Sequence, residues 1–310
     1  MQICFCLQAS APALVESKTV PVVLNCKAGP GHAQEEIERL RRAFGEAGLE
    51  ADVVACHGRE VREAAREALK ARPAVLAAAG GDGTLNAVAD VVRGTRTALG
   101  IVPRGTMNHF AKDLGIPLDP VEAAKTIAAG RRTQVDVGEV NGRCFINNAS
   151  LGLYPGIVRE RARQQQRLRR SKRWAMLWAT LAVLDRPPLL ELRLEVDGHA
   201  REVRAPFVFV GNNDYDMQGF NVGTRTRLDA GLLDIYTTRR CSSGGLLMLA
   251  LHALFGRLRQ ADDFLEANAR SLRVASRRPR LLVATDGEVV SMETPLEFVL
   301  RPRALEVIVP

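Results

Sequence analysis

Three glycines and one aspartate stand where a short apolar run, residues 74–79, gives way to a helical pattern. Leu85, Val88 and Val92 recur at helical spacing, so the sequence predicts a strand, a tight turn and the start of a helix. The first turn of a helix has unpaired backbone N–H groups and the positive end of the helix dipole, which together suit phosphate. The candidate residues are Gly80, Gly81, Asp82, Gly83, Thr84, Leu85 and Asn86.

Asp82 is the unusual member of this loop. A carboxylate beside bound phosphates repels them unless it holds a divalent cation or takes part in the reaction. The loop has neither the Gly-Lys-Ser/Thr of an ATPase loop nor the third glycine of the dinucleotide fingerprint. A tight connection without function is the simpler alternative, but Asp82 and Thr84 favour a phosphate or nucleotide site.

A second loop of the same kind, Pro103-Arg104-Gly105-Thr106-Met107-Asn108, follows the apolar run 98–102. Because neighbouring parallel strands end at the same edge of a sheet, we expect the two loops to face one ligand. A third glycine turn, from Asn25 to Gly31, also ends a predicted strand and is a weaker candidate for the same crevice.

The elements that position these loops alternate along the first half of the chain. Strands are predicted at 20–25, 51–55, 74–79 and 98–102, with helical patterns between them. Short connections between alternating strands and helices indicate a doubly wound parallel α/β sheet. We place this α/β nucleotide-binding domain at residues 20–133, after a tail at residues 1–19.

The second half has a different pattern, with strands joined by Asn-Gly and Asp-Gly turns. It is predicted to be a largely antiparallel, β-sandwich-like domain at residues 134–310, whose last strand is a candidate to return to the first domain. Asp197-Gly198 and Asp286-Gly287 are each explained by hairpin geometry alone. The expected strands are 135–140, 143–147, 190–196, 203–210, 232–237, 281–290, 296–300 and 305–309.

The formal net charge of +8 is concentrated in one segment. Residues 159–173 contain eight basic side chains and one acidic one, and Trp174 and Trp178 follow at helical spacing. A solvated helix face is the plain reading, but a basic stretch beside an apolar face is also how a helix lies on an anionic membrane surface. With 5% aromatic residues and no RNA-binding motif, nucleic acid is not the expected partner.

The six cysteines are scattered, without a Cys-x-x-Cys pair or a histidine at zinc spacing. This usage predicts a reduced, cytoplasmic protein. No signal-like segment and no run of about 18 apolar residues is evident. Together with the basic segment, this predicts a peripheral protein at the inner face of the membrane.

The chain resembles the diacylglycerol kinase catalytic family, which includes bacterial lipid kinases and sphingosine kinases. The resemblance rests on Gly80–Asn86, on Pro103–Asn108 followed by Phe110-Ala111, on Asn147–Gly152 and on Asp286-Gly287-Glu288. It implies an α/β domain followed by a β-rich domain, with ATP bound in a cleft between them. The first motif alone is shared with NAD kinases.

The resemblance also implies roles for residues. Asp82 would hold Mg²⁺ at the phosphates, and Glu288 would deprotonate the lipid hydroxyl, so these two are the catalytic candidates. Ala230 stands where the family has an aspartate that ligates a structural Mg²⁺, which leaves neighbouring Asp229 as a candidate ligand, and His109 also replaces a family aspartate. The implied ATP contacts are Asn25, Gly80, Gly81, Asp82, Gly83, Thr84, Leu85, Asn86, Gly105, Thr106 and Asn108.

The predicted function is therefore an ATP- and Mg²⁺-dependent lipid kinase that phosphorylates a diacylglycerol-like or sphingoid hydroxyl. The alternatives are an NAD kinase and a non-catalytic nucleotide- or lipid-binding protein on the same fold. Expected partners are the lipid substrate and an anionic membrane surface contacted by residues Arg159 to Trp178, and a homodimer is left open.

Overall fold

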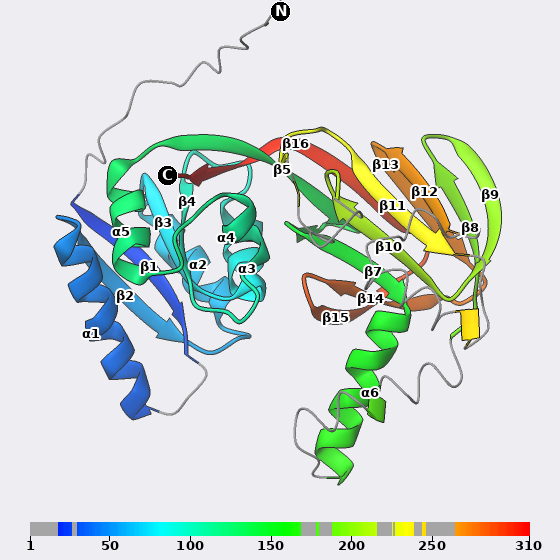
Figure 1. Ribbon diagram of the computed structural model, residues 1–310, viewed down its shortest axis with the longest axis horizontal. Helices are drawn as coiled ribbons and strands as arrows, with labels where there is room; N and C mark the ends of the chain where they lie inside the picture. Colours follow the sequence, from blue (N-terminus) through cyan, green and yellow to red (C-terminus); the bar gives the residue numbers. More distant parts are fainter. Residues whose placement is uncertain are drawn as a thin grey trace, which may run out of the picture. The chain divides into compact units, whose positions relative to one another are not determined.

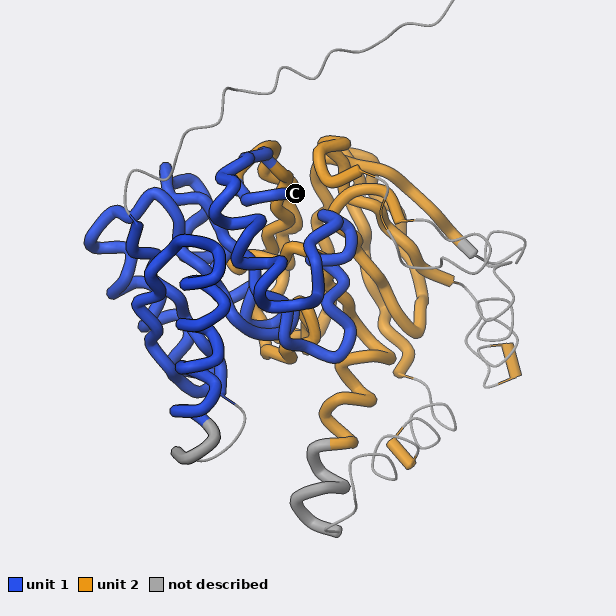
Figure 2. Tube along the Cα trace, turned by 60° about the vertical axis from the view of Figure 1, so that its left-hand side comes forward, with its two compact units in different colours: residues 1–134, 305–310 blue, residues 135–304 orange. Residues whose placement is uncertain are grey.

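A computed structural model describes residues 18–26, 30–168, 178–179, 188–215, 225, 227–238, 244–245 and 264–310 (Figure 1). The chain divides into two compact units (Figure 2). Unit 1 consists of residues 1–134 and 305–310, and unit 2 of residues 135–304. Strands β5 (Arg132–Val140) and β16 (Leu296–Ile308) contain residues of both units.

Unit 1 is built on a parallel sheet in the order β2-β1-β3-β4. The end of β16 adds a further parallel strand, since Val307 pairs with Leu99 of β4. Every residue of β3 and β4 is buried, as expected of central parallel strands covered on both faces. The four strands are β1 (Thr19–Asn25), β2 (Glu50–Cys56), β3 (Val75–Gly80) and β4 (Ala98–Pro103).

Helices alternate with these strands, so the α/β prediction is confirmed for this part of the chain. The first and last helices pack on each other and on the sheet, and the second packs on the third, which covers β3 and β4. The helices are α1 (Pro30–Glu46), α2 (Val61–Lys70), α3 (Asp82–Val92), α4 (His109–Asp113) and α5 (Pro120–Ala129).

Unit 2 contains two antiparallel arrangements of strands, which confirms the predicted sandwich-like architecture. One contains β8 (Leu190–Val196), β9 (His199–Ala205), β13 (Ser271–Ser276), β6 (Arg143–Phe145) and parts of β5 and β16. The other has the order β12-β11-β10-β7-β14-β15. These strands are β7 (Asn148–Gly152), β10 (Phe207–Asn212), β11 (Leu233–Thr238), β12 (Phe264–Ala269), β14 (Arg280–Thr285) and β15 (Glu288–Glu293).

Side chains from both sheets share one apolar core. Phe145 and Phe298 are fully buried and meet edge to face with ring centroids 6.4 Å apart. The core includes Leu151, Leu192, Val210, Ile235, Leu272, Val283 and Leu296. Helix α6 (Leu153–Leu168) follows β7 directly and packs on β7 and β14.

Several strand predictions in unit 2 were wrong. The segment 203–210 is not one strand, because the chain leaves β9 at Ala205 and enters β10, in the other sheet, at Phe207. Pro206 between them has no N–H to continue a ladder. The predicted strands 296–300 and 305–309 form the single strand β16, and β7, β12 and β13 were not predicted.

The membrane-facing prediction for Arg159 to Trp178 concerns residues that the structure describes only in part. Helix α6 ends at Leu168, and the side chains of 162–177 lie outside the described residues. Most of the predicted tail, residues 1–17, lies outside them too. Among the helices that are described, none is long and apolar enough to cross a membrane.

Candidate functional site

Three strand ends of unit 1 lie side by side at one edge of its sheet. Strands β1, β3 and β4 are parallel neighbours, and Gly80 is in register with Pro103. The N–H of Arg104 donates to the carbonyl oxygen of Gly80 at 2.8 Å. The two glycine loops are therefore adjacent, as their positions after parallel strands predicted.

The loops touch through their backbones, and this contact requires glycine. A Cβ atom on Gly105 would lie 2.6 Å from the Cα atom of Gly81 and 2.6 Å from Oδ1 of Asn108. A Cβ atom on Gly80 would lie 2.5 Å from the side chain of Thr84. These glycines are needed for close approach, and none of the three has a positive φ.

Helix α3 begins at the meeting point of the loops. Gly81 is its N-cap in an extended conformation, and its carbonyl oxygen accepts N–H groups from Thr84 at 2.8 Å and Leu85 at 3.0 Å. Asp82 and Gly83 occupy the first two helical positions, whose N–H groups have no acceptor within the helix. Asn25, at the end of β1, donates from Nδ2 to Oγ1 of Thr84 at 2.8 Å. The glycine turn that follows β1 is thus linked to the start of α3.

The Asp82 carboxylate faces the second loop. Its Oδ1 accepts the N–H of Phe110, in the first turn of α4, at 3.3 Å. One long hydrogen bond uses little of the acceptor capacity of a carboxylate. Asp82 can therefore both link the two loops and bind a cation.

The remaining predicted contacts have different environments. Asn108 has a left-handed backbone (φ 51°), accepts the N–H of Gly105 at Oδ1 and donates from Nδ2 to the Gly105 carbonyl oxygen, so its amide shapes the loop. Thr106 is exposed at the loop surface. Asn86 is buried, and Leu85 is fully buried in the core, so Leu85 supports the loop by packing.

Arg104 and Glu36 are polar residues of this region that the sequence reading did not single out. They form an ion pair between the second loop and α1. Burial lowers the pKa of the Arg104 guanidinium. The electrostatic interaction with Cys26 has the smaller, opposite effect on this pKa. An arginine inside a glycine loop was the available signal.

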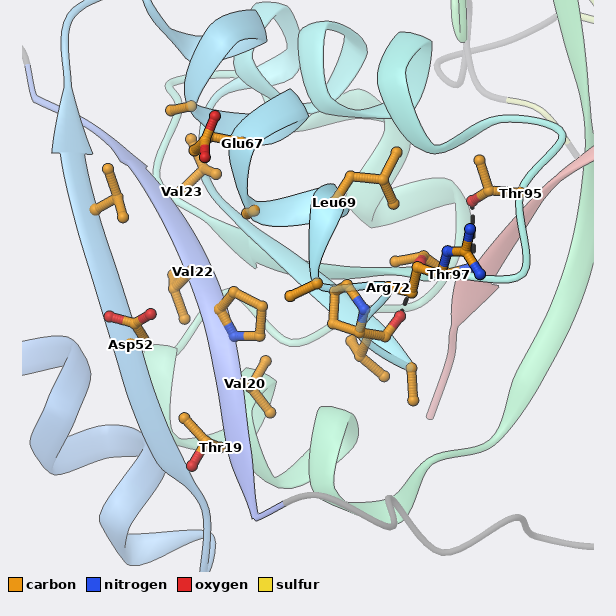
Figure 3. A pocket seen from close by; sticks show the side chains of 18 of the residues that line it. Thr19, Val20, Val22, Val23, Asp52, Glu67, Leu69, Arg72, Thr95 and Thr97 are labelled. Atoms are coloured by element: carbon orange, nitrogen blue, oxygen red, sulfur yellow. Dashed lines mark hydrogen bonds between the residues drawn. The ribbon is translucent and has the colours of Figure 1, made fainter.

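A cavity of about 1470 Å³ lies in unit 1 away from these loops (Figure 3). It is lined by Thr19, Val20 and Val75 at the amino ends of their strands, by Asp52 of β2 and by α2. The glycine loops follow the opposite, carboxyl ends. The chemistry expected of the loops therefore does not extend to this cavity.

No group of three or more His, Cys, Asp or Glu side chains within the described ranges is arranged to hold a metal ion. Asp229, the candidate structural ligand, forms an ion pair with Arg227 at 3.1 Å. His109 is exposed at the first position of α4.

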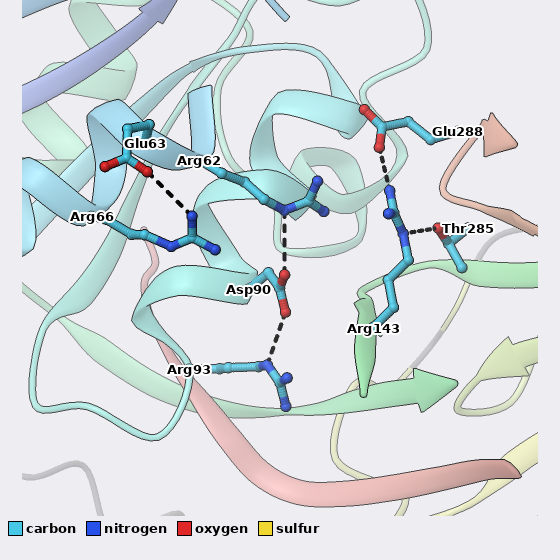
Figure 4. Close-up of polar contacts among 8 residues, drawn as sticks. All are labelled: Arg62, Glu63, Arg66, Asp90, Arg93, Arg143, Thr285 and Glu288. Carbon is cyan, nitrogen blue, oxygen red and sulfur yellow. Dashed lines mark hydrogen bonds and ion pairs between the residues drawn. The ribbon is translucent and has the colours of Figure 1, made fainter. Parts of the chain in front are cut away.

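In unit 2, Glu288 is the first residue of β15 and pairs in register with Thr285 across the hairpin turn. Its carboxylate forms an ion pair with Arg143 of β6, whose Nε also donates to Oγ1 of Thr285 at 2.9 Å (Figure 4). Glu288 is exposed, so its carboxylate is accessible from solvent.

The turn before Glu288 does more than reverse the chain. Asp286 and Asp197 both have positive φ and precede a glycine with φ of 87°, so the predicted hairpin geometry is confirmed at both. Asp286 also accepts three backbone N–H groups, from Ile146, Asn147 and Asn148, at 2.8 to 3.0 Å. Burial raises the pKa of Asp286 to about 6, opposed by these hydrogen bonds and by the charge of Arg225. Asp286 therefore anchors the backbone of residues 146–148 in addition to forming the predicted hairpin turn.

The segment that holds Asp286 belongs to a buried polar network that sequence reasoning missed. Arg225 is 5% exposed and donates to the carbonyl oxygens of Ile146 at 2.7 Å and Asn212 at 3.1 Å, and to Oδ1 of Asn147 at 2.8 Å. Asp136, 1% exposed, accepts the N–H groups of Gly231 and Arg303, each at 2.8 Å. No local spacing signals these contacts, because their partners are 13 to 167 positions apart in the chain.

Comparison with known proteins agrees with this arrangement. Residues 19–140 match the family model of the diacylglycerol kinase catalytic domain, and residues 152–309 match that of the YegS C-terminal NAD kinase beta sandwich-like domain. A diacylglycerol kinase of Bacillus subtilis (strain 168) is 27% identical over 302 residues, 94% of this chain and 97% of the relative. One from Staphylococcus aureus (strain bovine RF122 / ET3-1) is 28% identical over 299 residues, 94% and 93% of the two chains.

A solved structure is similar over nearly the same length. The crystal structure of a candidate diacylglycerol kinase from Bacillus anthracis str. Sterne superposes with a TM-score of 0.73 at 25% identity and covers 95% of this chain and 98% of its own. The fold, the paired glycine loops and these matches define a phosphotransferase of the lipid kinase class. The chain belongs to the diacylglycerol kinase family.

Proposed function

We propose that this protein transfers the γ-phosphoryl group of ATP, with Mg²⁺, to the hydroxyl of a diacylglycerol-like or sphingoid lipid. The observation that carries the proposal is the contact between the two glycine loops at the start of α3, with Asp82 beside them. Backbone N–H groups at a helix start suit phosphate oxygens, and one carboxylate suits Mg²⁺, which usually keeps several waters and is shared with substrate phosphates. The residues present fit the nucleotide and the ion.

In unit 1, backbone N–H groups and side chains contribute differently to binding. The N–H groups of Asp82 and Gly83 bind phosphate oxygens, and the Asp82 carboxylate holds the ion. Asn25 fixes Thr84, while Gly105 and Asn108 keep the second loop against Gly81. Bound Mg²⁺ supplies charge neutralisation at the phosphates. Phosphoryl transfer depends mainly on such positioning and neutralisation.

Glu288 is the proposed general base. An exposed carboxylate held by an ion pair can accept the proton of the lipid hydroxyl as the hydroxyl oxygen attacks the γ-phosphorus of ATP and ADP leaves. The lipid acceptor is supported by relatives named diacylglycerol kinase that match 94% of this chain. We further propose attachment to the anionic inner face of a membrane through the basic segment from Arg159.

Replacing Asp82 with asparagine tests the proposal. Asp82→Asn keeps an acceptor for the N–H of Phe110 but removes the charge that holds the ion, so kcat should fall by about 100-fold or more. The measurement is transfer of labelled phosphate from ATP to diacylglycerol in vesicles with and without anionic lipid, over a range of Mg²⁺ concentrations. Lower turnover without anionic lipid is expected from the membrane proposal.

Asp90→Asn is the matched control, because Asp90 lies on the same helix but is paired with Arg62 and Arg93 (Figure 4). It should leave kcat within about twofold of the unchanged protein. Equal turnover of Asp82→Asn and the unchanged protein would refute the proposed role of Asp82 in holding the ion. ATP binding without any phosphorylated lipid would instead support the non-catalytic alternative.

A further inference from the structure

The side chain of Arg143 joins β6 to the hairpin that carries Glu288. Its Nε donates to Oγ1 of Thr285 at 2.9 Å, and its Nη2 forms an ion pair with Oε2 of Glu288 (Figure 4). The Arg143 side chain is 22% exposed and that of Glu288 is 46% exposed. The Arg143 side chain is thus largely enclosed, while the Glu288 side chain that it contacts stays accessible.

Two independent sets of contacts fix Arg143 relative to Glu288. Thr285, fully buried in β14, is in register with Glu288, so the hydroxyl that orients the guanidinium belongs to the same rung of the hairpin. Asp286 ties the turn to the backbone of residues 146–148, which follow β6 directly. Arginine presents its donors in a planar fork, so a guanidinium bound at Nε has little freedom at Nη2.

We propose that Arg143 is the positioning residue of Glu288 in phosphoryl transfer, which rests on the proposed role of Glu288 as the base. A glutamate side chain on a strand surface loses rotamer freedom when it is ordered for reaction. Arg143 orders the carboxylate before the lipid hydroxyl arrives. Orientation of this kind raises the rate of the chemical step without changing how ATP binds.

The same hairpin offers a matched control pair. Arg280 of β14 contacts Glu293 of β15 at 3.0 Å, at the end of the hairpin away from the turn. These side chains are 55% and 78% exposed. Arg280→Met removes one positive charge and one arginine–glutamate contact of this hairpin, as Arg143→Met does, but leaves the contact between Arg143 and Glu288 intact.

The test compares kcat and KM for ATP in Arg143→Met, Arg143→Lys, Arg280→Met, Glu288→Gln and the double variant Arg143→Met with Glu288→Gln. Arg143→Met should lower kcat about 10- to 100-fold with KM for ATP within about twofold, because only orientation is lost. Arg143→Lys should recover part of kcat, since an ammonium can pair with Glu288 but cannot form the fork. Arg280→Met should match the unchanged protein. In the Glu288→Gln background, Arg143→Met should cause no further loss.

The outcomes separate this inference from the proposed function. If Glu288→Gln lowers kcat strongly while Arg143→Met leaves it unchanged, the positioning role is overturned and the base stands. An equal loss from Arg143→Met with and without Glu288 would also overturn it, because Arg143 would then act independently. Full turnover of Glu288→Gln would instead refute Glu288 as the base. Circular dichroism verifies folding, and Arg143→Lys keeps the test open if Arg143→Met does not fold.

Discussion

The two units place their polar groups in opposite ways. In unit 1 the strands β3 and β4 are buried and apolar throughout, and the candidate ligand groups stand at the strand ends. In unit 2, Asp136, Arg225 and Asp234 are each at most 5% exposed. The unit 1 site is built mainly from backbone near glycine, whereas the Glu288 hairpin is anchored by buried side chains from distant parts of the chain. Each arrangement predicts a different response to mutation and to pH.

The largest expected difference between the units concerns buried arginine. Arg225→Met would leave the carbonyl oxygens of Ile146 and Asn212 and Oδ1 of Asn147 without this donor inside unit 2. Removing one partner of a buried charged network typically costs about 3–5 kcal/mol of unfolding free energy. Urea unfolding measures this loss, and hydrogen exchange of the amides of β7 and β10 should locate it in unit 2.

Arg132→Met is the counterpart in unit 1. Arg132 contacts Glu306 at 3.1 Å, and both side chains are more than a fifth exposed, so the loss should be about 1 kcal/mol or less. Unfolding of both variants at the same urea concentration would show that the two units do not differ in this way. Faster hydrogen exchange in β7 and β10 in Arg225→Met alone would support the difference.

The second expected difference is the pH dependence of stability. Burial raises the pKa of Asp234 from 3.8 to about 6, although the Tyr236 hydroxyl and the N–H of Tyr215 donate to it. Its Oδ1 is buried without a hydrogen-bond partner within the described chain. A carboxyl whose pKa is higher in the folded state favours folding below pH 3.8, and this contribution is lost as the pH rises through about 6. The full change for one such group is about 3 kcal/mol.

Burial also raises the pKa of Asp286 to about 6, which adds a second contribution with the same sign. The unfolding free energy should therefore fall between pH 4 and 6.5, and Asp234→Asn should reduce this slope to about half. Thermal unfolding midpoints across that pH range provide the measurement. A slope unchanged by Asp234→Asn would mean that Asp234 stays ionised in the folded protein throughout.

The same difference between the units explains how much of the fold and of the candidate site could be predicted from the sequence. The strands and loops of unit 1 could be predicted because strand periodicity and glycine position are local signals. Parallel pairing then brings Gly80 and Pro103 together. In unit 2, Pro206 separates two strands that a continuous pattern suggested were one. The segment 281–290, predicted as one strand, is likewise divided into β14 and β15 by the turn at Asp286. Arg225 and Asp136 had no local signal, since their roles depend on partners from other strands.

The smallest of these effects tests whether the unit 1 site is indeed built from backbone. Gly105→Ala would place a Cβ atom 2.6 Å from the Cα atom of Gly81, and backbone on both sides leaves little room to adjust. Moving the loops apart should cost about 1–3 kcal/mol of unfolding free energy. It should lower kcat at least about 10-fold, because a small misplacement of phosphate-binding groups is enough to slow transfer.

Gly83→Ala is the control within the same site. A Cβ atom on Gly83 would have nothing within 4 Å, and alanine is the better helix former by up to about 1 kcal/mol. Gly83→Ala should therefore keep or raise the urea midpoint, which makes it the control for the stability of the loops. If Gly105→Ala behaved like Gly83→Ala, the loops would not need their backbone contact. The site in unit 1 would then depend on side chains after all, as the hairpin in unit 2 does.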